Sequence, residues 1–368
     1  MTSSQIEIQL IAAVVAVACA LPGVFLVLRR MAMMSDAISH TVLLGIVLAF
    51  FLVGSMESPL LVFGAAAMGL VTVSLVELLN KTGLVKQDAA IGLVFPALFS
   101  LAVILISRYA NGVHLDVDAV LLGELAFAPF DRLTIFGTSV PKSLAIMSGI
   151  LLLNILFITV LYKELKLATF DAGLAATLGL SPALVHYGLM GIVSITAVGA
   201  FDGVGSILVV ALMIAPAAAA YLLTDSLPRM IGLAALIGIL SAVSGYWLAR
   251  TLDANIAGSM ATMTGVVFLA TFLFSPKRGM VAVGRRRQRQ KWEFAQTSLA
   301  MHLMNHEATP AASTECTVEH LQEHFRWQPD FADKVIVKAQ QRHLIKRENG
   351  HLVLLDNGRS LAREALIN

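Results

Sequence analysis

The sequence is short of charged residues and of cysteine, and both shortages restrict the class of protein. Only 14% of its 368 residues are charged, whereas 57% are hydrophobic, and the mean hydropathy is +0.80. This composition excludes a soluble globule and predicts a polytopic membrane protein. The two cysteines, Cys19 and Cys316, lie in an apolar run and in a polar tail. They provide neither a disulfide framework nor a thiolate zinc cluster.

The sequence also lacks the phosphate-binding loop Gly-x-x-x-x-Gly-Lys-Ser/Thr. Gly279 and Gly284 have the glycine spacing, but Arg285 follows where the loop needs lysine. We therefore expect that this chain is not an enzyme and does not hydrolyse ATP itself.

Nine apolar runs are long enough to cross a bilayer, which takes about 20 residues. They lie near 6–28, 34–54, 59–79, 89–107, 143–162, 183–200, 204–223, 229–250 and 255–275. Most Lys and Arg between these runs fall on one side, which the positive-inside rule assigns to the cytoplasm. The sequence thus predicts an inner-membrane protein with the N-terminus outside and the C-terminus in the cytoplasm. Arg250 is the exception to this pattern, and the topology of 108–142 stays open.

The composition changes after Pro276. Residues 1–276 carry 11 Lys and Arg against 14 Asp and Glu, whereas residues 277–368 carry 15 against 10. We expect a transmembrane domain at 1–276, a basic linker at 277–291 that favours anionic lipid, and a cytoplasmic domain at 292–368.

Asp36 and His40 are an ionisable pair inside an apolar span. Four residues apart on a helix, they point the same way, and His40 would lie about 15 Å deep, near the bilayer midplane. Ionisable groups at this depth are costly and usually line an ion pathway, although such a pair can also simply hold helices together. The donor set favours a divalent metal.

A second acidic group follows the fourth span. Asp116 and Glu124 would share a helix face, and His114 and Asp118 are weaker candidates that can equally be solvated surface residues. Nitrogen and oxygen ligands without sulfur suit manganese, iron(II) or zinc.

A third segment, 170–182, lies on the cytoplasmic side. Asp171, Ala175 and Gly179 are spaced four apart. On a short helix they would form one face of small residues that can lie close to a partner.

Four segments, 31–40, 114–124, 170–182 and 204–220, resemble in order the permease subunit of bacterial ABC importers for manganese, zinc and iron. The resemblance implies a homodimer or a dimer with a related permease, a separate cytoplasmic ATPase, and an extracytoplasmic metal-binding protein. It implies that Asp36, His40 and Asp116, with Glu124 assisting, line the metal route, and that 170–182 is the coupling helix. No cofactor is expected to be bound permanently, because the metal is the transported substrate.

The tail extends beyond a minimal permease. Helices are expected near 289–306, 317–326 and 330–343, then a hairpin at 344–355 with an Asn349-Gly350 turn, and a closing helix from Asp356. This pattern resembles the winged-helix domain of metal-dependent repressors of the diphtheria-toxin-repressor class. The fold class is therefore an all-α membrane bundle with a small C-terminal winged helix.

Lys334, Lys338 and Arg342 recur every four residues on the third tail helix and could meet phosphates. The alternative is a solvated face, which the nearby acids and the membrane tether favour over DNA binding. Histidines also recur at helical spacing in the tail, as do two glutamates. Close to Cys316 these residues are Glu319, His320, Glu323 and His324. Earlier in the tail they are His302 and His306. A helical face of this kind could bind a cation, although polar helix surfaces often have the same pattern.

The sequence thus predicts the permease of a divalent-metal importer. Two alternatives stay open: a membrane-tethered metal sensor that uses the winged helix, and an importer of a metal chelate or cobalamin.

Overall fold

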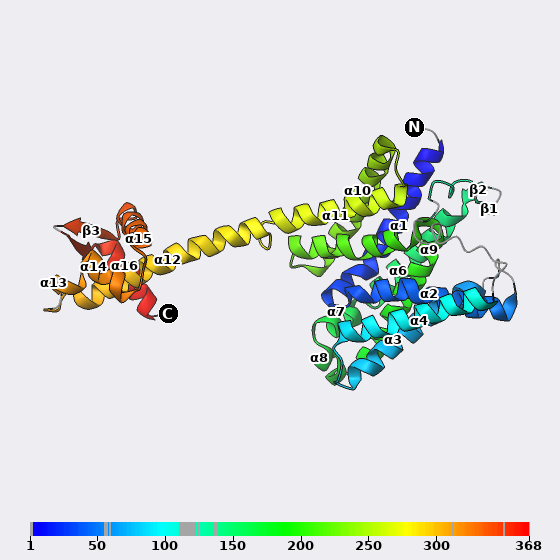
Figure 1. The fold of residues 1–368 in the computed structure, drawn as a ribbon, viewed down its shortest axis with the longest axis horizontal. Coiled ribbons are helices and arrows are strands. Elements are labelled where there is room, and N and C mark those ends of the chain that lie inside the picture. Colours follow the sequence, from blue (N-terminus) through cyan, green and yellow to red (C-terminus); the bar gives the residue numbers. More distant parts are fainter. Residues whose placement is uncertain are drawn as a thin grey trace. The chain divides into compact units, whose positions relative to one another are not determined.

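The protein divides into two compact units, Met1–Gly279 and Met280–Asn368. The computed structural model describes residues 3–54, 58, 60–109, 123, 125–135, 138–310, 312–348 and 350–367, with Asp202 described in its backbone only. Figure 1 shows the helices of each unit. The two units are described separately below.

Among the described residues, nine helical segments are long and apolar enough to cross a membrane, which confirms the predicted spans. They are α1 (Ser3–Leu28), α2 (Ala32–Val53), α3 (Leu60–Lys81), α4 (Gln87–Tyr109), α6 (Lys142–Val160), the two parts Pro182–Phe201 and Gly203–Leu223 of α9 (Pro182–Leu223), α10 (Leu227–Leu252) and α11 (Ile256–Phe274). Two short helices, α7 (Tyr162–Phe170) and α8 (Ala172–Thr177), lie between α6 and α9.

Helices α1 and α9 form the centre of the membrane unit. Helix α9 contacts most of the other spans, and α1 is the most deeply buried of them. Their close approach depends on Gly23, because a Cβ there would overlap the carbonyl oxygen of Met213. A buried polar contact adds to this packing: Asn154 of α6 donates from Nδ2 to the carbonyl oxygen of Ala18 at 2.9 Å and to Thr196 at 3.0 Å. The centre is therefore fixed by shape and by satisfied hydrogen bonds.

Helix α9 is interrupted at Gly205, where φ is +76° and ψ is 162°. A residue with a side chain rarely adopts this conformation, whereas glycine does so at little cost. The interruption lies near the start of the second span, Gly203–Leu223. Gly123 lies against this break, since a Cβ on Gly123 would meet the backbone of Val204 and Gly205.

A small antiparallel pair of strands, β1 (Arg132–Ile135) and β2 (Thr138–Pro141), precedes α6. Arg132 joins this hairpin to the start of α1 through an ion pair with Glu7, at 3.0 Å. The prediction of an entirely helical membrane domain missed these strands, because a four-residue strand has too little periodicity to stand out from a loop.

The second unit begins with the long helix α12 (Met280–His306). The residues expected to form a basic linker, up to Lys291, mostly belong to this helix. Helices α13 (Ala312–Glu315), α14 (Val318–His324) and α15 (Pro329–Gln341) follow, then the antiparallel strands β3 (Ile345–Glu348) and β4 (His351–Leu354), and α16 (Asp356–Ile367). Its core includes Leu299, Leu321, Val335 and Ile345. Three of the predicted helices, the hairpin and the closing helix are thus present at the expected positions.

Candidate functional site

Asp36 and His40 lie in the first turns of α2, inside the membrane unit. Oδ1 of Asp36 lies 3.5 Å from Nε2 of His40, so the two polar groups point to the same place, as their spacing predicts. The side chains are 37% and 28% exposed. The pair is therefore held together but is not enclosed by its own chain.

Aromatic rings from α4 form one wall around His40. Its ring lies 5.1 Å from the ring of Phe95 and 5.8 Å from that of Phe99. These apolar rings restrict the imidazole on one side and leave the carboxylate side open. Asp116, Glu124, His114 and Asp118 lie outside the described residues.

A polar network at the ends of α1, α3 and α9 escaped the sequence analysis. Glu77 accepts a hydrogen bond from the Tyr187 hydroxyl at 2.7 Å, and its other oxygen lies 2.9 Å from Nε2 of His186. Arg29 approaches Nδ1 of His186 at 3.5 Å and donates from Nε to Thr169 at 3.0 Å. The sequence indicates this network only by one acid, Glu77, inside an apolar run. The partners of Glu77 lie far away in the sequence, so no local pattern reveals them.

The segment 170–182 differs from the prediction in one respect. Asp171 is the N-cap of α8 and accepts a hydrogen bond from the backbone N–H of Leu174 at 2.9 Å. The helix ends at Thr177, and Gly179 has a φ of +83°, so it terminates the helix instead of extending its face. The expected face of Asp171, Ala175 and Gly179 was therefore wrong. Ala175 is buried within the membrane unit.

Exposed apolar side chains surround α8 instead. Phe170, Leu174, Leu178 and Leu184 are 62%, 47%, 64% and 75% exposed. Phe170 ends α7, Leu174 lies in α8 and Leu178 directly follows α8. Leu184 lies in the first turn of α9, at the start of a candidate span. We call these four residues the α8 patch. Exposed apolar groups that lie close together mark a surface that contacts another protein or the membrane.

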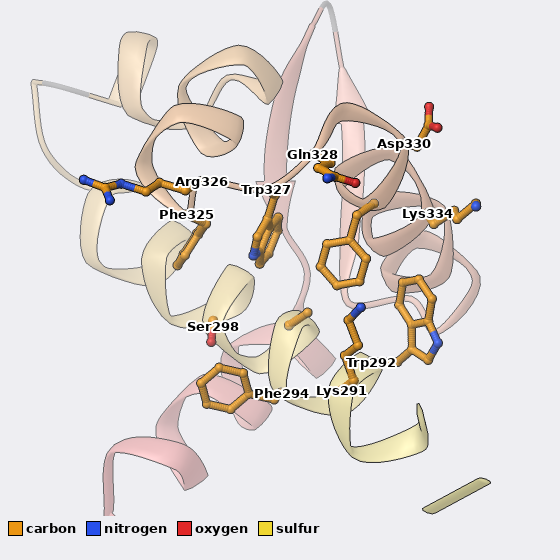
Figure 2. A pocket seen from close by; sticks show the side chains of 12 residues that line it. Lys291, Trp292, Phe294, Ser298, Phe325, Arg326, Trp327, Gln328, Asp330 and Lys334 are labelled. Carbon is orange, nitrogen blue, oxygen red and sulfur yellow. The ribbon is translucent and has the colours of Figure 1, made fainter. Parts of the chain in front are cut away.

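The basic side chains on α15 are partly occupied by contacts with α12. Nζ of Lys338 lies 3.9 Å from the ring centre of Trp292, and Arg342 donates a hydrogen bond to Gln296 at 2.9 Å. Lys334 lines a pocket of about 870 Å³ between α12 and the α14–α15 segment. Figure 2 shows Trp292, Trp327 and Lys291 around this pocket. Two of the three expected phosphate-binding side chains thus stabilise the unit itself.

Four of the six histidines of the second unit converge. Rings of His306 and His324 lie 4.7 and 4.6 Å from the ring of His302, and His320 lies 5.9 Å from it. Glu315 joins them, with Oε2 2.6 Å from Nε2 of His320. Glu319 and Glu323, expected on the same face, instead line a neighbouring surface pocket with His320.

Residues 5–275 match the model of the ABC 3 transport family. The chain belongs to this family. It is therefore the membrane-spanning permease of an ABC transporter. The match covers nearly all of the membrane unit, to the end of α11, including Asp36, His40 and the α8 patch.

Curated relatives extend the similarity. The chain is 51% identical over 360 residues to the zinc transport system membrane protein TroD of Treponema pallidum, which covers 98% of both chains. It is 52% identical over 268 residues to the manganese transport system membrane protein MntD of Bacillus subtilis, covering 73% of this chain and 90% of the relative. The first alignment includes the C-terminal unit.

Solved structures show the same membrane fold. PsaBC from Streptococcus pneumoniae, in complex with Fab, superposes with a TM-score of 0.63 at 29% identity, covering 75% of this chain and 94% of that chain. An inward-facing conformation of a putative metal-chelate type ABC transporter superposes with a TM-score of 0.51 at 20% identity, covering 72% and 84%. The latter shows a similar fold only.

Proposed function

We propose that this permease imports a divalent transition metal, with manganese and zinc as the first candidates and iron(II) as the third. The observation that carries the proposal is the Asp36–His40 pair, a carboxylate and an imidazole 3.5 Å apart within a span. Imidazole and carboxylate together suit these metals. The names of the relatives, which include zinc and manganese transport proteins, support the same cargo.

The proposed route continues from Asp36 and His40 to Asp116 and Glu124. The latter two, with the weaker candidates His114 and Asp118, are assigned from the sequence and its resemblance to the importer permeases. Each residue would replace part of the ion's hydration shell. The ion must be held only briefly, so we expect a pathway with few protein ligands at each position instead of a closed four-ligand cage, which is typical of structural sites.

The exposure of Asp36 supports a dimer. A carboxylate that is 37% exposed within a membrane span would face lipid in a single chain, at a cost of several kcal/mol. A second copy, or a related permease, covers this face and places two Asp36–His40 pairs on one aqueous route. Dimerisation therefore solves the problem of exposure and builds the pathway.

ATP hydrolysis is assigned to a separate cytoplasmic subunit that docks on the α8 patch. The four exposed apolar side chains of this patch provide the contact surface. The sequence has no phosphate-binding loop of its own. An extracytoplasmic binding protein delivers the metal. In this arrangement the N-terminus is outside, and the α8 patch and the C-terminal unit face the cytoplasm and its anionic lipid.

The unit Met280–Asn368 is proposed to be a winged-helix domain that acts on the transporter and not on DNA. Helices α12, α14 and α15 with the β3–β4 hairpin support the fold. Lys338 and Arg342 support the function, because their contacts with Trp292 and Gln296 leave them less free to bind phosphates.

The test is metal accumulation in cells that lack their own importers and express this permease with its ATPase and binding protein. Manganese, zinc and iron are measured in parallel. Selective accumulation of at least one metal supports the proposal. If none accumulates although the permease is present in the membrane, the proposed cargo is wrong.

A further inference from the structure

Five potential metal ligands meet in the second unit, far along the chain from the proposed pathway. Among the described residues, one ligand atom each from His302, His306 and Glu315 lies within 4.8 Å of the other two. Ligands around a tetrahedral ion with bonds near 2.1 Å are separated by about 3.4 Å. Small side-chain rotations therefore suffice to close these three groups around one ion.

His320 and His324 lie close enough to supply further ligands to the same ion. Nε2 of His320 is buried without a hydrogen-bond partner, although it lies at ion-pair distance, 2.6 Å, from Oε2 of Glu315. A buried nitrogen without a directed hydrogen bond is costly, and a shared cation would satisfy both it and the carboxylate. The ring of His324 lies 4.6 Å from that of His302.

The ring of His302 is oriented by a contact with the backbone. Its Nε2 lies 3.1 Å from the backbone oxygen of Glu315. In the tautomer that donates to this oxygen, Nδ1 keeps its lone pair, an arrangement common among metal-bound histidines.

We propose that His302, His306, Glu315 and His320 form a second divalent-metal site, with His324 as a substitute ligand. Three imidazoles and one carboxylate, without a thiolate, select zinc or a similar ion of the first transition row. The site joins the end of α12 to α13 and to the start of α14. A bound ion therefore fixes these helices to each other.

The cluster adjoins a surface pocket. This pocket, of about 760 Å³, is lined by His320 together with Glu319 and Glu323. Carboxylates that line a pocket attract cations, and His320 belongs to both the pocket and the cluster. The site would thus exchange metal with the solution around this unit, so that its occupancy follows the concentration of free metal.

The test uses the full-length permease, purified in lipid nanodiscs and stripped of metal. Cobalt(II) is the probe, because tetrahedral and octahedral cobalt differ in their visible absorption, and zinc is then added in competition. The variants are His306→Ala and Glu315→Gln, which remove one ligand each while sparing the buried His302. The control His343→Asn changes an exposed histidine of the same unit whose φ of +51° asparagine tolerates.

We expect a tetrahedral cobalt spectrum that zinc displaces, and metal affinity at least about 10- to 100-fold weaker in His306→Ala and Glu315→Gln. His343→Asn should bind like the wild type. The pathway variant carrying both Asp36→Asn and His40→Ala should retain this spectrum, which separates the site from the proposed transport route. Unchanged binding in both ligand variants, or loss of all binding in the pathway variant, would overturn the proposal.

Discussion

Glu77 and His186, on different helices of the membrane unit, face each other with Oε1 and Nε2 2.9 Å apart. The same carboxylate accepts the hydrogen bond from Tyr187, and His186 is the neighbour of Arg29, which holds Thr169 at the end of α7. Helix α7 leads directly into the α8 patch. The Glu77 network therefore connects the proposed ATPase contact to the neighbouring ends of α1, α3 and α9.

Replacing Glu77 by glutamine should destabilise the permease by about 1–3 kcal/mol, because the partly buried Tyr187 hydroxyl and His186 ring lose a charged partner. The measurement is thermal unfolding of the detergent-purified variant. Lys81→Gln is the control, since Lys81 contacts the same carboxylate from an exposed position, and it should change stability by less than about 0.5 kcal/mol. Equal effects of the two substitutions would show that stability does not depend on the contacts of Glu77 with His186 and Tyr187.

Gly23→Ala should prevent normal packing of α1 on α9. The added methyl group would overlap the carbonyl oxygen of Met213, and a backbone group cannot rotate away. Gly232→Ala on α10 is the matched control, because a Cβ there meets open space. Size-exclusion profiles should show aggregation or loss of the first variant and a normal peak for the second. A normal peak for both would contradict the close approach.

Asp171→Ala should weaken α8 by about 1 kcal/mol, the usual cost of losing an N-cap. Asp171→Asn should retain the cap, because an amide oxygen can also accept from the Leu174 N–H. We expect lower transport-coupled ATPase activity for the alanine variant than for the asparagine variant. If both variants lose activity equally, the charge of Asp171, and not its cap, is what matters.

Leu178→Glu should reduce co-purification of the ATPase with the permease by removing apolar area from the α8 patch and adding a charge. Leu178→Met preserves the apolar surface and should co-purify normally. Equal recovery of the ATPase with the glutamate and methionine variants would place the docking surface elsewhere.

The membrane spans could be predicted because each is an apolar run of sufficient length, a property of the local sequence. The position of the β3–β4 hairpin followed equally from Asn349-Gly350 between short apolar segments. The end of α8 was mispredicted because small residues four apart suggest a helix face, whereas the left-handed φ of Gly179 stops the helix.

Contacts between distant segments could not be predicted. The pairing of Glu77 with His186 requires α3 to pack beside α9, and no local pattern encodes that neighbour. The histidine cluster of the second unit could not be predicted from local sequence either. The spacing of His302 with His306, and of His320 with His324, predicted two separate pairs, but only the fold of the unit brings them together around Glu315.

The central claim is that Asp36 and His40 carry the metal, and uptake into proteoliposomes tests it most directly. Permease, ATPase and binding protein are reconstituted together, and ATP-driven entry of manganese and zinc is measured for the wild type, Asp36→Asn, His40→Ala and the control His343→Asn. We predict that the two pathway variants lose uptake although ATPase binding is retained, and that the control transports normally. Wild-type uptake by both Asp36→Asn and His40→Ala would contradict the assignment.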